Sequence, residues 1–195
     1  MEKETIKKEI IKSIQLPPEK PEEKKLYLFF GLTGSGKSTL AEEIKQRNNQ
    51  KSIYLAADKI SLTYKLDKSE HYNWTFEIFD ELLDYYLEQG YSVIADTNVD
   101  KHKIRKSYYQ LSEAREAEVK TYYLKSSLAE IKKRQRQRNQ LADSELRSQG
   151  LYSHAQKEIK NYLKELEIPQ KSEKVYLIDG DFDYAEQLDC WQRVE

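Results

Sequence analysis

The feature that most constrains this chain is a glycine-rich loop after its first apolar run. The loop matches the pattern G-x-x-x-x-G-K-[S/T] and reads Gly31-Leu32-Thr33-Gly34-Ser35-Gly36-Lys37-Ser38-Thr39. An apolar strand pattern at residues 25–30 precedes it, and a helix pattern opens at Lys37. A strand, such a loop and a helix in this order form a phosphate-binding loop. The motif therefore predicts an α/β fold with a nucleotide site.

The residue types of the loop suit the binding of a nucleotide. The glycines let the backbone turn tightly, so that successive N–H groups and the positive end of the helix dipole face phosphate oxygens. Lys37 is expected to reach the β- and γ-phosphates, Ser38 to join the coordination shell of Mg²⁺, and Thr39 to steady the α-phosphate. ATP and Mg²⁺ are the predicted cofactors. The predicted nucleotide-binding residues are Gly31, Leu32, Thr33, Gly34, Ser35, Gly36, Lys37, Ser38 and Thr39.

The composition argues against several classes of partner. The 195 residues include 33 basic and 34 acidic side chains, and the formal net charge of -1 favours neither a polyanion nor a membrane surface. A single cysteine, Cys190, cannot form a disulfide within the chain, and no signal peptide or long apolar span is visible. We expect a cytoplasmic protein without membrane contact, in which any contact with nucleic acid is local.

The chain divides into an amino-terminal segment and one larger domain. Residues 1–24 carry isoleucines at helical spacing and then three prolines, which predicts a helix and a linker. The helix is expected to dock on the domain or, less often, on a partner helix. Residues 25–195 alternate short β-rich runs with helical patterns, which predicts a parallel sheet flanked by helices. Strands are expected at 26–30, 52–56, 92–95, 119–124 and 175–178, and helices at 37–48, 74–88, 102–116 and from 128 onwards.

Two aspartates follow predicted strands, where ligands of parallel sheets bind. Asp58 follows the second strand and is a candidate general base that would accept a proton from a hydroxyl group. Its alternative role is that of an N-cap of a following helix. Asp96 ends the third strand in a pattern like Walker B. It would hold Mg²⁺ through water, hold the substrate, or only satisfy backbone donors.

A basic stretch at residues 132–138 follows the fourth strand. Arg134 and Arg138 are four residues apart and share one helix face, whereas Arg136 points away. The planar guanidinium pairs bidentately with phosphate and stays charged. The stretch predicts a helical lid at about residues 132–168 that brings Arg134 or Arg138 to the phosphates. A solvated basic face is the alternative.

These motifs resemble those of P-loop kinases of the polynucleotide-kinase and zeta-toxin type, often catalogued as AAA-like ATP-binding proteins. The resemblance covers roughly residues 25–181 and rests on the phosphate loop, both aspartates, Arg105, and the pair Arg134 and Arg138. It implies a P-loop NTPase fold with adenylate-kinase-like strand order and a catalytic Lys37. It further implies Asp58 as the base, Asp96 and Arg105 at the acceptor, and a lid arginine on the transferring phosphoryl group.

The sequence therefore predicts an ATP-dependent phosphotransferase that moves the γ-phosphate to a hydroxyl of a small molecule or of a nucleic-acid 5′ end. The alternative is an ATP-binding switch or ATPase module that acts on a protein partner, with the amino-terminal helix as a contact.

One position departs from the resemblance. Polynucleotide kinases of this type carry Asp-x-x-Arg after the second strand, and this chain has Ser61 in place of the arginine.

Overall fold

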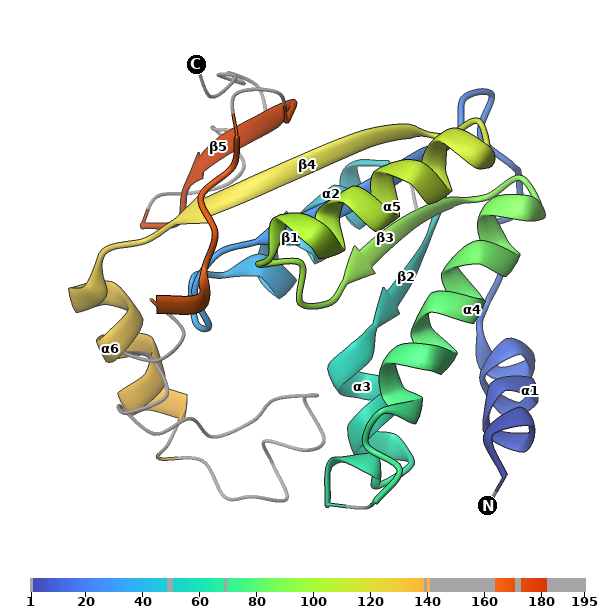
Figure 1. The fold of residues 1–195 in the computed structure, drawn as a ribbon, viewed down its shortest axis with the longest axis horizontal. Coiled ribbons are helices and arrows are strands. Elements are labelled where there is room, and N and C mark those ends of the chain that lie inside the picture. The colour runs from blue at the N-terminus through green and yellow to red at the C-terminus, as the bar shows by residue number, and fades with distance from the viewer. Residues whose placement is uncertain are drawn as a thin grey trace.

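Five parallel strands form the central sheet, in the order β2-β3-β1-β4-β5 (Figure 1). The strands are β1 (Lys25–Phe30), β2 (Ser52–Ala56), β3 (Ser92–Asp96), β4 (Glu118–Lys125) and β5 (Val175–Asp179). The computed structural model describes residues 2–48, 51–68, 70–138, 140, 164–170 and 173–181. All neighbouring strands pair in parallel. The predicted five-stranded parallel sheet is confirmed, and each strand boundary lies within one residue of its predicted position.

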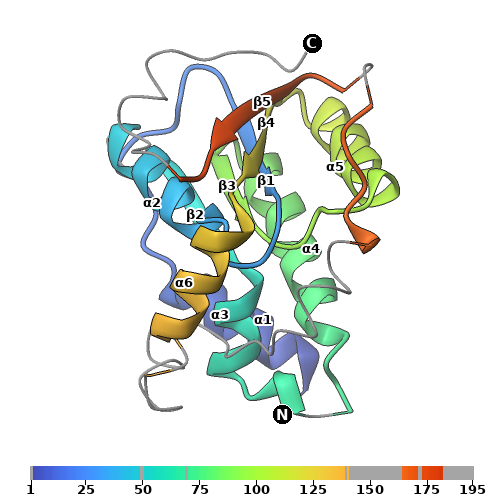
Figure 2. The same cartoon turned by 90° about the vertical axis from the view of Figure 1, so that its left-hand side faces the viewer.

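Helices cover both faces of the sheet, as a fully buried parallel sheet requires. They are α1 (Lys3–Ser13), α2 (Lys37–Arg47), α3 (Ala57–Thr63), α4 (Trp74–Glu88), α5 (His102–Ala114) and α6 (Leu128–Arg138), with a 3-10 helix at Leu66–Lys68. Side chains of β1 alternate between the faces: Leu28 packs in the core that includes α4, whereas Phe29 packs with Leu40 of α2. Figure 2 shows α2 and α5 on opposite sides of the sheet.

The helix α3 was not among the predicted helices. Its seven residues make only two turns, which is too short for an apolar repeat of helical period to stand out. The helix follows β2 without an intervening loop, because Ala56 both ends the strand and precedes the first helical residue. This direct junction fixes the position of Asp58 close to the end of β2.

The amino-terminal helix α1 docks on the domain, as its isoleucines predicted. Ile6 and Ile10 are buried in the same apolar core as the sheet and α4. On the rim, the Lys3 ammonium lies 2.9 Å from both Glu77 and Glu81 of α4. The apolar stripe is thus used within the chain, and α1 shares one core with the domain that follows.

The predicted lid, residues 132–168, lies largely outside the described residues. Its beginning is the second half of α6, and its end is the segment 164–168. Within the described parts of the chain, no helix has both the length and the apolar character needed to cross a bilayer.

Candidate active site

The glycine-rich loop lies between β1 and α2, as predicted, and its glycines are required by geometry. Gly31 has φ +141°, and a Cβ atom at this position would lie 2.3 Å from the carbonyl oxygen of Leu124. Gly36 has φ +102° and directly precedes the first helical residue of α2. Residues with side chains rarely adopt these values. Leu32 packs against Ile131 of α6, so the loop is also held by apolar contact.

Lys37 is the first residue of α2, and its side chain folds back over the loop. Its ammonium donates hydrogen bonds to the carbonyl oxygens of Gly31, at 2.8 Å, and of Leu32, at 3.2 Å. These contacts hold the positive charge at the loop, where phosphates need to be neutralised. Ser38 and Thr39 are exposed in the same first turn. The predicted nucleotide-binding residues therefore span the loop after β1 and the first turn of α2.

Ser38 and Asp96, the two predicted metal residues, meet at the hydroxyl of Tyr54. The Tyr54 hydroxyl donates a hydrogen bond to Asp96 Oδ2 at 2.7 Å. The Ser38 side chain is hydrogen-bonded to the same hydroxyl. Burial, together with the charge of Asp96, raises the pKa of Tyr54 far above its ordinary value. The phenol therefore stays protonated and remains a donor to the carboxylate.

The residues at this point suit magnesium. A serine hydroxyl and a carboxylate are the hard oxygen donors that Mg²⁺ takes, and Mg²⁺ is usually held by one or two carboxylates together with substrate phosphates. Among the described residues, no group of three or more His, Cys, Asp or Glu side chains could hold a metal. The site therefore fits a metal that arrives with a nucleotide and does not fit a metal cage made of protein alone.

Asp58 lies in the first turn of α3 and is exposed. The alternative role as an N-cap is wrong, because α3 begins at Ala57 and Ala56 is the residue at its N-cap position. Asp58 is close to Tyr72, which is 47% exposed. Partial burial first, and then the charge of Asp58, raises the pKa of the Tyr72 hydroxyl. The exposed carboxylate of Asp58 thus lies near one partly exposed aromatic side chain, Tyr72.

Arg134 contacts the phosphate loop from its carbonyl side. Its guanidinium donates to the carbonyl oxygens of Gly34 (3.4 Å), Ser35 (3.2 Å) and Gly180 (2.7 Å), and to the carboxylate of Glu130 (3.0 Å). In such a loop the N–H groups face the phosphates, so these carbonyls point the other way. Arg134 therefore braces the backbone of the loop. The side chain of Arg138 lies outside the described residues.

The turn after β5 packs against the same side of the loop. The Ser126 hydroxyl donates to the carbonyl oxygen of Ser35 at 3.1 Å, and Gly180 lies directly beside both residues. A Cβ atom on Gly180 would lie 2.0 Å from Ser126 Oγ and 2.6 Å from Ser35 O. The turn at residues 179–181 therefore supports the phosphate loop.

Replacing Gly180 with alanine is expected to weaken ATP binding by at least about tenfold. The new methyl group cannot fit without moving Ser35, and a shift of the loop removes aligned N–H donors that each contribute about 1.5–3 kcal/mol to a charged ligand. The measurement is the ATP dissociation constant by calorimetry. The matched control is Gly90→Ala, at a left-handed position beside Lys20, which should lower stability but leave ATP affinity unchanged. Equal ATP affinities in both variants would contradict the bracing role.

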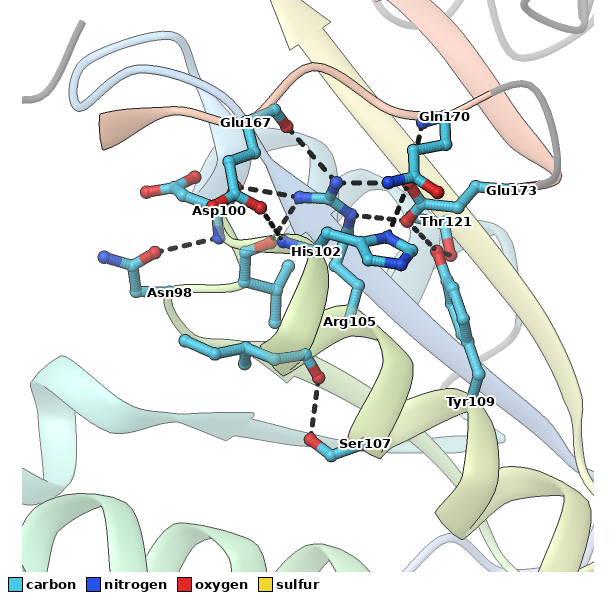
Figure 3. A network of polar contacts seen from close by, with 12 residues as sticks. Asn98, Asp100, His102, Arg105, Ser107, Tyr109, Thr121, Glu167, Gln170 and Glu173 are labelled. Atoms are coloured by element: carbon cyan, nitrogen blue, oxygen red, sulfur yellow. Dashed lines mark hydrogen bonds and ion pairs between the residues drawn. The ribbon is translucent and has the colours of Figure 1, made fainter. Parts of the chain in front are cut away.

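Arg105 is not available for a substrate, which corrects the role that the resemblance implied. Its side chain is 0% exposed, and all five N–H donors are used (Figure 3). Two pair with the carboxylate of Glu173, at 2.6 and 3.2 Å, and the others bind the backbone carbonyls of Val99, Asp100 and Glu167. The guanidinium also stacks over Phe30, 4.5 Å from the ring centre. Arg105 joins the loop after β3 to the chain before β5.

Asp100 connects this network to the phosphate loop. The carboxylate is buried, and its Oδ1 accepts a hydrogen bond from the backbone N–H of Gly31 at 3.4 Å. The Asp100 carbonyl accepts from Arg105 at 2.9 Å, and its backbone N–H donates to Asn98. The first glycine of the phosphate loop is therefore positioned by Asp100, which Figure 3 shows beside Arg105 in the network after β3.

The free energy of unfolding is expected to fall in acid because of Glu173. Burial alone would raise the pKa of its carboxyl group, but hydrogen bonds from Arg105 and from the Gln170 backbone outweigh burial and lower the pKa from 4.5 to about 2. The carboxylate therefore stabilises the fold above pH 4.5, and this contribution, on the order of 3 kcal/mol, is lost as the pH falls towards 2. Urea unfolding at pH 5 and pH 3 measures the loss.

The control for this pH dependence is a pair of glutamine variants. Glu173→Gln should unfold with a flatter pH dependence than the wild type. Glu81→Gln should change the pH dependence much less, because Glu81 forms its ion pairs with Lys3 and Lys7 at the surface. An unchanged pH dependence in Glu173→Gln would show that other carboxylates cause the acid sensitivity.

A phosphate loop at the carboxyl edge of a parallel sheet of this strand order, with a carboxylate after the adjacent strand, defines the P-loop NTPase fold. The chain belongs to the AAA domain family, whose sequence profile matches residues 26–163. No curated protein matched the chain in sequence.

Solved structures share this fold at low sequence identity. A structure of the PezAT toxin–antitoxin system of Streptococcus pneumoniae is 14% identical, with a TM-score of 0.66 over 95% of this chain and 81% of that one. Kti12 of Chaetomium thermophilum, in complex with ADP-AlF3, is 15% identical, with a TM-score of 0.62 over 83% and 92%. The APS kinase CysC of Mycobacterium tuberculosis, in complex with AMPPNP and APS, is 16% identical, with a TM-score of 0.57 over 87% and 95%.

Proposed function

We propose that the protein is an ATP-dependent phosphotransferase that moves the γ-phosphate of ATP to a hydroxyl group of a small molecule. The observation that carries this proposal is the position of Asp58. This exposed carboxylate follows β2, β2 pairs in parallel with β3, and β3 pairs with β1, which leads into the phosphate loop. A candidate base and a phosphate site therefore leave the sheet at one edge. A kinase among the structural neighbours, the APS kinase CysC, supports the same reaction type.

Each residue of the site has a distinct role in this proposal. Lys37 neutralises the β- and γ-phosphates, and Ser38 and Asp96 would hold Mg²⁺, which supplies further charge neutralisation when it is bound. Asp58 orients the acceptor hydroxyl and takes its proton as the phosphoryl group is transferred. Arg138 is the lid arginine assigned to the transferring group, because Arg134 braces the loop. A closed lid excludes water that would otherwise hydrolyse ATP.

The surroundings of Asp58 favour a small acceptor over a nucleic-acid end. Ser61 is buried where polynucleotide kinases carry an arginine. Lys59, the nearest cation in sequence, has its ammonium 3.8 Å from Glu42 and 4.9 Å from the ring centre of Tyr54. Its charge is therefore already engaged beside α2. Neither residue 59 nor residue 61 therefore offers a guanidinium that could bind a phosphate of the acceptor through two hydrogen bonds. An acceptor whose hydroxyl is on an uncharged group does not need such a guanidinium.

The test is transfer of labelled γ-phosphate from ATP in the presence of Mg²⁺. The acceptors are sugars, nucleosides, 5′-hydroxyl RNA and DNA, and water, and the blank is Lys37→Ala. Label on a sugar or nucleoside that depends on Lys37 supports the proposal. Label on RNA or DNA ends alone would contradict the small acceptor. Tight ATP binding with neither transfer nor hydrolysis would favour the ATP-binding switch instead.

A further inference from the structure

Tyr54 reaches along the sheet to a residue on the neighbouring strand. It lies opposite Ile94 in the β2–β3 register, and Asp96 lies opposite Ala56. The side chain therefore spans about two residues, roughly 6.6 Å, towards the carboxyl edge of the sheet. Its hydroxyl ends 2.7 Å from Asp96 Oδ2 and is also hydrogen-bonded to Ser38. One side chain thus joins the first turn of α2 to the end of β3.

The ring of Tyr54 packs between two lysine side chains and an apolar core. Two ammonium groups lie over it: Lys45 of α2 at 5.9 Å from the ring centre and Lys59 of α3 at 4.9 Å. Lys59 is itself 3.8 Å from Glu42. The ring also packs against the apolar core that includes Phe29 and Ile94. Because the ring is fixed on both sides, its hydroxyl is a preorganised donor and has little freedom to turn away from Asp96.

We propose that Tyr54 is a positioning residue for the magnesium of the nucleotide complex. It orients the Asp96 carboxylate through its hydrogen bond and keeps that carboxylate beside Ser38. The proposal rests on the proposed function, because it takes Ser38 and Asp96 as the residues that hold Mg²⁺. Groups that orient a metal-binding residue typically change metal affinity by about 10- to 100-fold when they are removed. The same loss is expected here for the metal and not for the nucleotide itself.

The experiment measures binding and needs no turnover. The dissociation constant of AMPPNP is measured by calorimetry in EDTA and at increasing Mg²⁺, for the wild type and Tyr54→Phe. Tyr54→Phe is expected to bind AMPPNP normally in EDTA and to need about tenfold more Mg²⁺ for half of the metal-dependent gain. Mn²⁺, followed by its paramagnetic signal in the same complex, should show the same loss of affinity.

Two further variants separate orientation from general damage. Tyr27 of β1 accepts a hydrogen bond on its hydroxyl from the Asn48 side chain, at 3.0 Å. Tyr27→Phe removes this hydroxyl and should leave the Mg²⁺ requirement unchanged. Adding Tyr54→Phe to Asp96→Asn should cause no further loss of metal affinity, because the tyrosine acts through that carboxylate. Additive losses would overturn the proposal.

The outcomes distinguish this inference from the proposed function. If Mg²⁺ strengthens AMPPNP binding in the wild type and equally in Tyr54→Phe, the role of Tyr54 is refuted and the proposed function stands. If Tyr54→Phe weakens binding equally with and without metal, the tyrosine supports the loop and the proposal is also refuted. If Mg²⁺ has no effect on the wild type, the metal assignment of the proposed function fails first.

Discussion

Replacing Asp58 with asparagine is expected to slow phosphoryl transfer by about 10²- to 10⁴-fold, with ATP affinity within a few-fold of the wild type. Asparagine keeps the shape of the side chain but cannot accept the proton of the acceptor hydroxyl. The residue is exposed in the first turn of α3 and lies outside the phosphate loop, so its loss should spare both folding and ATP binding. Single-turnover transfer of labelled γ-phosphate and calorimetric titration with ATP measure the two effects.

The matched control for Asp58 is Asp67→Asn. Asp67 lies in the 3-10 helix at Leu66–Lys68, and its charge also raises the pKa of Tyr72, after burial and Asp58. It shares the electrostatic surroundings of Asp58 but does not follow a strand end. Transfer by Asp67→Asn should therefore stay close to the wild-type rate. If both variants slowed transfer equally, local negative charge rather than a base would be the cause, and an equal loss of ATP affinity in Asp58→Asn would also contradict the assignment.

Replacing Arg105 with methionine is expected to lower the free energy of unfolding by about 3–5 kcal/mol. The change leaves the Glu173 carboxylate buried without its bidentate partner, and removing one member of a buried ion pair costs about this much. Three backbone carbonyls also lose their donor. Urea unfolding monitored by circular dichroism measures the loss. Because the network holds Asp100, and Asp100 holds Gly31, ATP affinity should fall as well.

The arginine directly after the same helix provides the control for Arg105. Arg115 follows the last turn of α5 and pairs with Asp84 at 2.6 and 3.0 Å, but its side chain is 31% exposed. Arg115→Met should cost at most about 1 kcal/mol. The double variant Arg105→Met/Glu173→Met should recover stability relative to Arg105→Met, because no buried charge remains unpaired. A stable Arg105→Met protein with a raised KM for the acceptor would contradict this structural role and would indicate that Arg105 binds the substrate.

The order and type of most elements could be predicted because their signals are local. Each strand is a short apolar run between turn residues, and α4 shows a clear apolar repeat over its 15 residues, so its predicted bounds are those observed. The helix α3 is too short for such a repeat. The lid prediction extends over residues 141–163, which lie outside the described residues, so its helical character stays a prediction.

Outside the phosphate loop, the sequence predicted only those residues of the candidate site that directly follow a strand. Asp58 and Asp96 follow strands, and the rule for parallel sheets places both at the ligand edge. Tyr54 lies in the middle of β2 and looks like an ordinary strand residue in sequence. Glu173 carries no motif, and its importance arises from a partner 68 residues away in the chain. Resemblance suggested a substrate role for Arg105, since sequence does not show that all its donors are used inside the fold.

The sequence by itself determined the phosphate loop. The loop is contiguous: its glycines permit the backbone angles, and Lys37 and Ser38 follow within the same turn, so nothing beyond nine neighbouring residues is needed. Only the tertiary structure decided how the loop is supported and which charged side chains are free to act. Tyr54 and Asp96 are 42 residues apart, and Arg134 is 99 residues from Ser35. Such pairs meet because parallel strands bring their carboxyl ends to one edge, and burial there favours polar groups that hydrogen-bond to one another.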